Sequence, residues 1–125
     1  MTARVFRFVT LNTNNLRQIG ISPCKLVGAS LINTAATVFY AKFWWFKGAD
    51  AAAANPTVGT TAPDFVIAVP PLDAATGAVG SVTPSWPGGI DQAGAPLWVA
   101  CVTGAADSDN TAVAAGQGNI NLLIE

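Results

Sequence analysis

Hydrophobic residues along this chain come in short runs, most of which end at proline, glycine or asparagine. Runs of this kind, rich in β-branched and aromatic residues and bounded by turn formers, are typical of β-strands. The pattern predicts strands within these segments: 5–9, 25–32, 37–47, 64–69, 78–83, 97–103 and 119–124. The helical patterns that a parallel sheet needs between its strands are absent. We therefore expect an all-β protein, a single antiparallel β-sandwich similar to a jelly roll, with about seven strands.

The connections between these runs predict how the chain is organised. Segments 25–32 and 37–47 are joined by Asn33-Thr34-Ala35-Ala36, a turn-forming connection of loop length, which predicts a β-hairpin. Residues 1–22 contain one apolar run, then a polar stretch, and Pro23 follows them. We expect residues 1–22 to form an N-terminal strand and arm, and residues 23–125 to form the sandwich domain. A chain of 125 residues has room for one core.

Three predicted strands differ in how their two faces are composed. Segment 119–124 alternates, with isoleucine and leucine on one face and asparagine on the other, as expected for a strand with one solvated face. Segments 38–46 and 97–102 are apolar on both faces apart from Lys42, although a sandwich buries only one face of each sheet. Either long loops of the chain cover the outer face, or a protein partner does. In the second case the interface anchors would be Tyr40, Trp44, Phe46 and Trp98.

Charge is scarce and unevenly distributed. Charged residues make up 10% of the chain, against roughly 25% in average soluble domains. All six basic residues lie in the first 47 positions, and all seven acids follow them. This polarity favours assembly, in which basic groups of the N-terminal segment meet acidic loops of a partner or of another copy. The candidate interface charges are Arg4, Arg7, Arg17, Asp107 and Asp109.

Residues suited to catalysis or metal binding are few. The chain has no histidine and its only glutamate is the last residue, which excludes Ser-His and Cys-His catalysis. The glycine pairs do not match a phosphate-binding loop. The acidic stretch 107–110 lacks the glycine and glutamate of a calcium loop, because Ala112 and Gly118 occupy those positions. We expect a protein that is not an enzyme, with no catalytic residues, no metal and no cofactor.

The remaining composition bears on partners and on the redox state of the cysteines. A pI near 5.1 with only three arginines predicts no nucleic-acid binding. The longest uncharged apolar stretch falls short of a membrane span, so no membrane partner is expected. Cys24 and Cys101 are interpreted as two small buried residues, with a single bridge between neighbouring strands as the alternative.

Several short motifs resemble those of a known class of proteins. They are Asn33–Ala36, Tyr40–Phe43, Pro56–Thr60, Pro87–Ile90 and, most distinctively, Gly104–Gly116. Together they resemble small structural proteins of tailed bacteriophages, of the head decoration or cement type. The resemblance covers residues 25–125 and leaves residues 1–22 unmatched. Two segments depart from this resemblance: the alanine tract 50–55 is an insertion, and the run 43–46 has more aromatic residues than these phage proteins usually have there.

The resemblance implies a function and a location. It implies an antiparallel sandwich without catalytic activity that binds the major capsid protein and stabilises the head shell. It further implies a homo-oligomer, with a trimer favoured, on the capsid exterior of a virion after synthesis in the host cytoplasm. The alternative is a fibre or tail-associated sandwich that binds a host-surface glycan. In that case Trp44, Trp86 or Trp98 would be the residue that stacks on the sugar.

Overall fold

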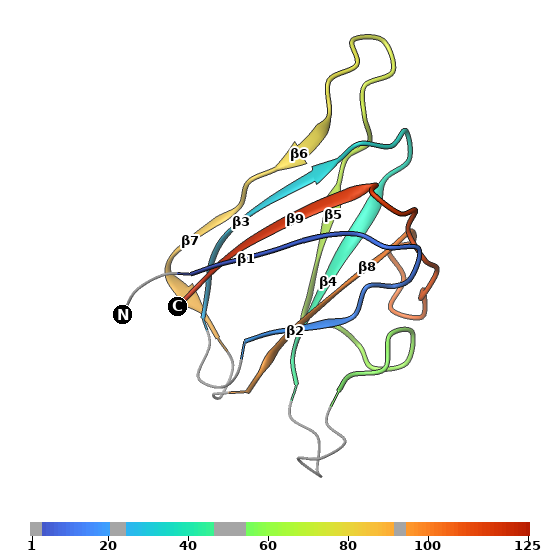
Figure 1. Cartoon of the computed structure of the whole chain (residues 1–125). Helices are drawn as coiled ribbons and strands as arrows, with labels where there is room; N and C mark the ends of the chain where they lie inside the picture. Colours follow the sequence, from blue (N-terminus) through green and yellow to red (C-terminus); the bar gives the residue numbers. More distant parts are fainter. Residues whose placement is uncertain (1–3, 21–24, 47–54, 92–94) are drawn as a thin grey trace.

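The computed structural model describes residues 4–20, 25–46, 55–91 and 95–125, and within them it shows two antiparallel sheets packed face to face (Figure 1). This confirms the predicted all-β sandwich. No helix in these ranges is long and apolar enough to cross a membrane. The strands are β1 (Arg4–Val9), β2 (Arg17–Gly20), β3 (Leu26–Asn33), β4 (Phe39–Trp45), β5 (Phe65–Val69), β6 (Gly80–Val82), β7 (Ser85–Ile90), β8 (Leu97–Val102) and β9 (Gly118–Ile124).

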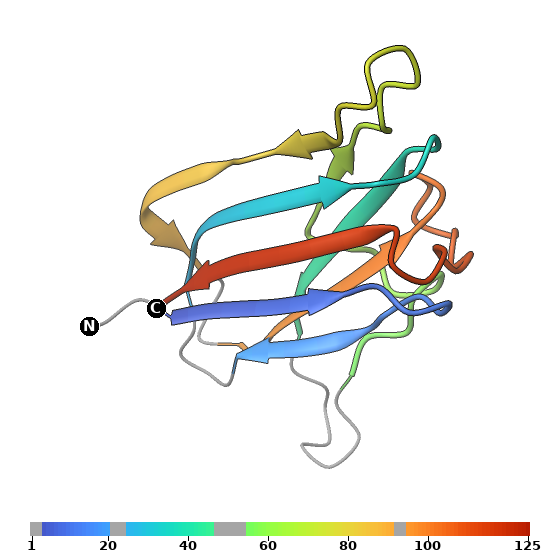
Figure 2. The same ribbon diagram turned by 45° about the horizontal axis from the view of Figure 1, so that its top comes forward.

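The strand order is that of a jelly roll. The first sheet has the order β1-β9-β3-β6, with β7 also paired to β3, and the second sheet has the order β2-β8-β4-β5. Strands β6 and β7 act as one strand interrupted near Pro84, whose carbonyl accepts a hydrogen bond from the Ala29 amide at 3.0 Å. Counted so, eight strands are divided between two four-stranded sheets in the double Greek-key arrangement (Figure 2), and only the consecutive strands β4 and β5 lie in the same sheet.

The hairpin predicted from segments 25–32 and 37–47 is wrong. Both strands exist, but β3 lies in the first sheet and β4 in the second. The Asn33 side chain donates hydrogen bonds to the carbonyls of Thr37 at 2.8 Å and Val69 at 3.2 Å, and accepts one from the Ala35 amide. These bonds hold an arch that carries the chain from one sheet to the other. Both strands then bury apolar residues in the same core, across the sandwich instead of along one sheet.

The N-terminal segment is part of the sandwich instead of a separate arm. All six residues of β1 pair with β9, and β2 pairs with β8. Phe8 and Ile19 are buried in the core. The guanidinium carbon of Arg17 lies 4.7 Å from the centre of the Phe8 ring, which joins the edges of the two sheets. Residues 4–20 therefore pair with strands of both sheets, and the predicted boundary at residues 22/23 lies outside the described residues.

The core between the sheets follows the alternation that the sequence predicts. Ile120, Leu122 and Ile124 of β9 point inward, and the odd-numbered residues of β4 and β8 face them. Cys101 lies among them as a buried free thiol, and burial raises its pKa to about 12 although the positive charge of Arg17 acts in the opposite direction. Cys24 lies outside the described residues.

Loops of the chain cover the outer face of the second sheet. Trp44 is only 2% exposed because Val58 packs over it, and its indole nitrogen donates to the Thr61 carbonyl at 3.0 Å. Beside it, the fully buried Lys42 ammonium donates to the carbonyls of Ala106 and Asp109. The apolar residues on this face are thus explained by the first of the two alternatives, coverage by the chain itself.

Candidate protein-binding surface

The outer face of the first sheet remains uncovered in the described structure. The strand registers place Val5, Leu123 and Gly28 in one row across β1, β9 and β3, with their side-chain positions pointing outward. Val5 is 68% exposed and Leu123 is 38% exposed. The next row along the strands contains Arg7, Asn121 and Ser30. An aliphatic row therefore lies beside a polar one on an open sheet face.

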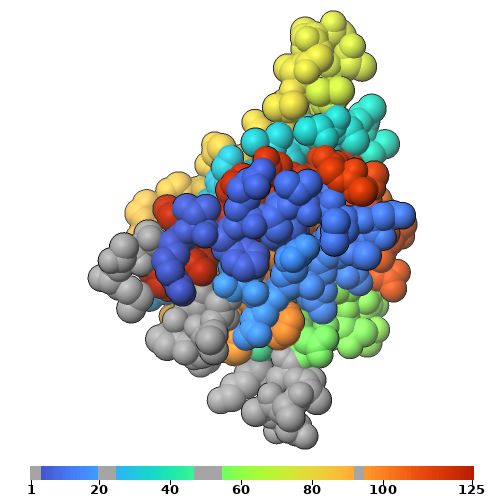
Figure 3. Space-filling view, viewed as in Figure 1, coloured from blue at the N-terminus to red at the C-terminus, as the bar shows by residue number. Residues whose placement is uncertain are grey.

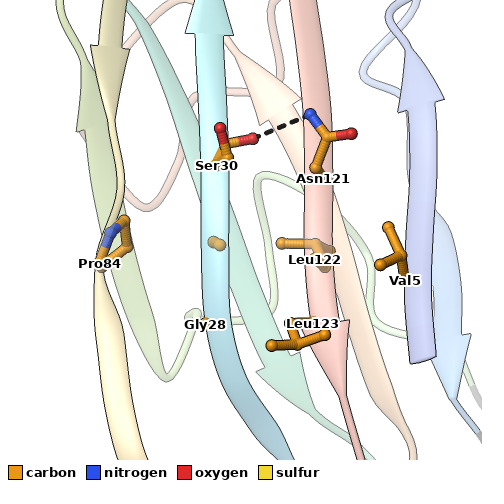
Figure 4. Close-up of a pocket in the computed structure, with 8 residues that line it drawn as sticks. Val5, Gly28, Ser30, Pro84, Asn121, Leu122 and Leu123 are labelled. Carbon is orange, nitrogen blue, oxygen red and sulfur yellow. Dashed lines mark hydrogen bonds between the residues drawn. The ribbon is translucent and has the colours of Figure 1, made fainter. Parts of the chain in front are cut away.

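A groove of about 330 Å³ follows the aliphatic row (Figure 4). Side chains of Val5, Leu123 and Pro84 line it, and Gly28 lies between them. Because Gly28 has no side chain, β3 leaves a depression in the sheet face at this point. A Cβ at this position would contact the Pro84 carbonyl oxygen at 3.6 Å. The Asn121 amide closes the polar end by donating to the Ser30 carbonyl at 3.2 Å. The groove can accept small aliphatic groups next to a hydrogen-bonding edge.

The charges around the groove are few and mainly positive on the β1 side. Arg7 is exposed and occupies the row next to Val5, and Arg4 is exposed at the start of the same strand. At the end of β9 and β3 nearest the groove, Glu125 and Lys25 exchange backbone hydrogen bonds of 2.9 Å, so one acid and one base also lie close to it. Interface centres are typically depleted of charge and rich in apolar contact, so this face has the composition of a protein-binding surface.

A compact turn projects from the other end of the first sheet, between β5 and β6 (Figures 1 and 3). In this 72–79 turn, the Asp73 amide donates to the Ala78 carbonyl and the Asp73 carbonyl accepts from the Gly77 amide, both at 2.8 Å. The Asp73 carboxylate accepts from the Ala75 amide at 2.9 Å. That amide and the Thr76 hydroxyl hold the pKa of Asp73 below its usual range. Val79 at the end of the turn is 50% exposed. The turn therefore presents an aliphatic side chain and a carboxylate.

The aromatic residues proposed as interface anchors lie elsewhere. Trp44 is buried under the chain's own loop and cannot be an exposed anchor, while Tyr40, Phe46 and Trp98 are half-buried against the same cluster. Trp86 packs edge-on against Phe65, with ring centres 5.8 Å apart. Within the described ranges the exposed large hydrophobic residues are all aliphatic: Val5, Val9, Leu11, Val79 and Leu123. These positions favour neither an aromatic interface nor a tryptophan that stacks on sugars.

The charged residues proposed for the interface are scattered. Arg7 lies on the open face, whereas Arg4 pairs with the inward-pointing Ile124 and is exposed at the end of β1. Arg17 is half-buried between the sheets, and within the described ranges its Nε atom has no hydrogen-bond partner. Asp107 is exposed, but the Asp109 carboxylate accepts from the Thr111 amide at 2.9 Å within its own loop. In the part of the chain that the structure describes, no three His, Cys, Asp or Glu side chains lie close enough to hold a metal ion.

Sequence reasoning missed the aliphatic row. Leu123 could have revealed it, because it breaks the alternation of β9. The two preceding outward positions on the solvent-facing side are Asn119 and Asn121, whereas the third is a leucine. Gly28 and Pro84 carried no comparable signal, because only the register of β3 and β7 brings them beside Leu123.

Comparisons of the chain with protein-family models, with curated proteins and with solved structures find no match.

Proposed function

We propose that this chain is a non-enzymatic structural protein of a virion, a decoration or cement protein that binds the major capsid protein on the capsid exterior. The observation that carries the proposal is the open face of the first sheet, where an aliphatic groove lies beside Arg7 and Asn121. Such a face supplies apolar contact area and a few hydrogen bonds, which a stable protein interface requires.

The fold supports the same class of function by analogy. Jelly rolls are frequent in viral capsid and lectin domains. A fold does not by itself determine function, so the chemistry of the surface must decide between these classes. Lectin-type binding would be favoured by an exposed aromatic ring among polar groups, whereas the exposed large hydrophobic residues of the described ranges are aliphatic. The surface therefore favours a protein partner.

Binding of this kind stabilises a shell by mass action. A protein that binds the assembled shell and not its dissociated subunits lowers the free energy of the shell by RT ln(1 + [L]/Kd) at each site. At a free concentration of 100 times Kd this amounts to about 2.7 kcal/mol for each bound copy. Summed over many copies, modest individual contacts suffice to strengthen a capsid.

Co-sedimentation with shells tests the proposal. The full chain is mixed with purified capsids of the phage that encodes it, and bound protein is measured after centrifugation. We expect saturable binding that weakens at least tenfold in Leu123→Arg, because a charge would occupy the groove. The matched control is Ala115→Arg, since Ala115 is exposed in the loop three residues before β9 begins, at the other end of the strand from Leu123. No binding of the unmodified chain, or equal binding of both variants, would contradict the proposal.

A further inference from the structure

Apart from Val9 and Leu11, at and just after the end of β1, the exposed large aliphatic residues of the described ranges lie at two separate places. One is the groove at the level of Gly28 on β3, and the other is the 72–79 turn, which leads into β6 opposite Asn33. Gly28 and Asn33 are five residues apart on one strand, or about 17 Å at the usual rise. The turn also projects away from the sheet (Figure 3). It therefore does not fill the groove of its own chain.

We propose that the 72–79 turn of one copy inserts into the groove of a second copy, with Asp73 facing Arg7, so that copies associate head to tail. This inference rests on the proposed function and refines it: a neighbouring copy fills the groove within the assembly, and the capsid protein contacts the rest of the open face, which includes Val9.

The turn and the groove match in size and in chemistry. Between Leu72 and Val79 the turn contains Asp73 and otherwise only alanine, threonine and glycine, so it offers small groups to a small cavity. A groove of about 330 Å³ lies at the lower end of the usual range for binding pockets. The hydrogen bonds centred on Asp73 already fix the turn, and Gly77 supplies a φ of 75° within it. A preformed turn loses little conformational entropy on binding.

The charges give the contact its orientation. Asp73 is the single acid of the turn and is fully exposed, and Arg7 is exposed one row from Val5 at the rim of the groove. When Val79 and the neighbouring alanines occupy the aliphatic row, a carboxylate on the same turn can approach the polar row that contains Arg7. Charge complementarity of this kind contributes more to register and specificity than to affinity.

The contact joins two different surfaces and is therefore heterologous. Such contacts produce a closed ring when the rotation between neighbours closes, and an open filament when it does not. In a ring, each copy uses its turn once and its groove once. A closed ring is the form that agrees with a decoration protein seated on a regular shell.

Light scattering after gel filtration, at micromolar concentration of the full chain, gives the first readout. We expect a discrete oligomer for the unmodified chain and for Ala115→Arg, and monomers for both Leu123→Arg, which blocks the groove, and Val79→Arg, which alters the turn. The melting temperature of each variant shows whether it is folded. A monomeric unmodified chain, or folded Leu123→Arg and Val79→Arg variants that remain oligomeric, would overturn the inference.

Mixing the two monomeric variants separates a head-to-tail contact from a symmetric one. Leu123→Arg keeps an intact turn and Val79→Arg keeps an intact groove, so an equimolar mixture has one complete contact per pair. We expect a 1:1 heterodimer by sedimentation equilibrium, and no larger species. If the mixture stays monomeric at concentrations where the unmodified chain is assembled, the contact is not of turn and groove, and the inference fails.

Two conservative variants test the predicted ion pair. Asp73→Asn keeps an oxygen that can accept from the Ala75 amide, and Arg7→Gln keeps a hydrogen-bonding side chain. Each should weaken self-association by roughly two- to fivefold, the usual effect of an exposed ion pair. The double variant should weaken it no further than either single one, because both remove the same interaction. Independent, additive effects would show that Asp73 and Arg7 do not meet.

The outcomes distinguish this inference from the proposed function. A monomeric chain that still binds shells through Leu123 would leave the proposed function intact and identify the capsid protein as the occupant of the groove. A ring that forms through the turn and groove but never binds shells would support the inference and contradict the proposed function.

Discussion

At the scale of single residues, Lys42 shows how a buried charge can serve the fold. It lies on β4 with no exposed surface, and its ammonium group reaches two backbone carbonyls of the 104–109 loop, those of Ala106 at 2.5 Å and Asp109 at 3.0 Å. A lysine buried without partners would be strongly destabilising. Here the two carbonyls satisfy the charge, and the charge in turn fixes the loop that covers the second sheet.

We predict that Lys42→Met destabilises the protein although methionine suits a buried position. The substitution leaves the carbonyls of Ala106 and Asp109 without their donor, which costs about 1–3 kcal/mol in the free energy of unfolding. Urea denaturation measures the change. The control is Lys25→Met, because Lys25 is exposed and a surface substitution should stay within about 0.5 kcal/mol. Equal stabilities of the two variants would show that Lys42 does not hold the loop.

At the scale of the elements, the strands were easier to predict than their pairing. The alternation of β9 and the two-sided apolar character of β4 and β8 follow from the sequence, since the polarity of alternate residues shows which faces of a strand are buried. Strand β2 has only four residues, and β7 contains Pro87, Gly88 and Gly89, so neither has a strong strand pattern. The pairing of β3 with β9 depends on residues about ninety positions away. Local signals do not contain that information.

Strand β1 provides the sharpest test at this scale, because an arm and a core strand predict opposite results. Phe8 is buried under the Arg17 guanidinium, so Phe8→Ala should cost about 3–5 kcal/mol in the free energy of unfolding. Val5 lies on the same strand but is 68% exposed, and Val5→Ala should change stability by less than about 0.5 kcal/mol. Both values come from urea titration. A small effect of Phe8→Ala would instead support the expectation that the N-terminal segment is an arm that contributes little to the core.

At the scale of the whole molecule, the candidate surface could be predicted only in part. Arg4 and Arg7 were found from the charge distribution, and of the two only Arg7 lies on the open face, since Arg4 pairs with the inward-pointing Ile124. The aromatic residues were proposed as interface anchors because they lie on strands that are apolar on both faces, but the structure places them under loops or in the core. The surface that remains is aliphatic, and it arises where three strands distant in sequence bring Val5, Leu123 and Gly28 into one row. That row exists only after the two Greek keys have formed.

The same folding disperses the charge asymmetry of the sequence. The first 46 residues supply β1 to β4, which divide between both sheets. As a result, Arg7 lies on the open face, Arg17 between the sheets and Lys42 inside the second layer. The basic residues that the structure describes therefore do not gather on one face, and long-range steering of a partner is not expected.

Self-association should accordingly depend only weakly on salt. In the head-to-tail contact the aliphatic row supplies most of the affinity, and the pair of Asp73 and Arg7 supplies the part that ions can screen. Raising the ionic strength from about 0.1 M to about 1 M shortens the Debye length from about 10 Å to about 3 Å. We expect the dissociation constant to rise by less than about fivefold over that range, and by less still in Asp73→Asn, which has lost the screened pair. Sedimentation equilibrium at the two ionic strengths measures it. A change of several orders of magnitude would mean that charge, and not the aliphatic groove, holds the copies together.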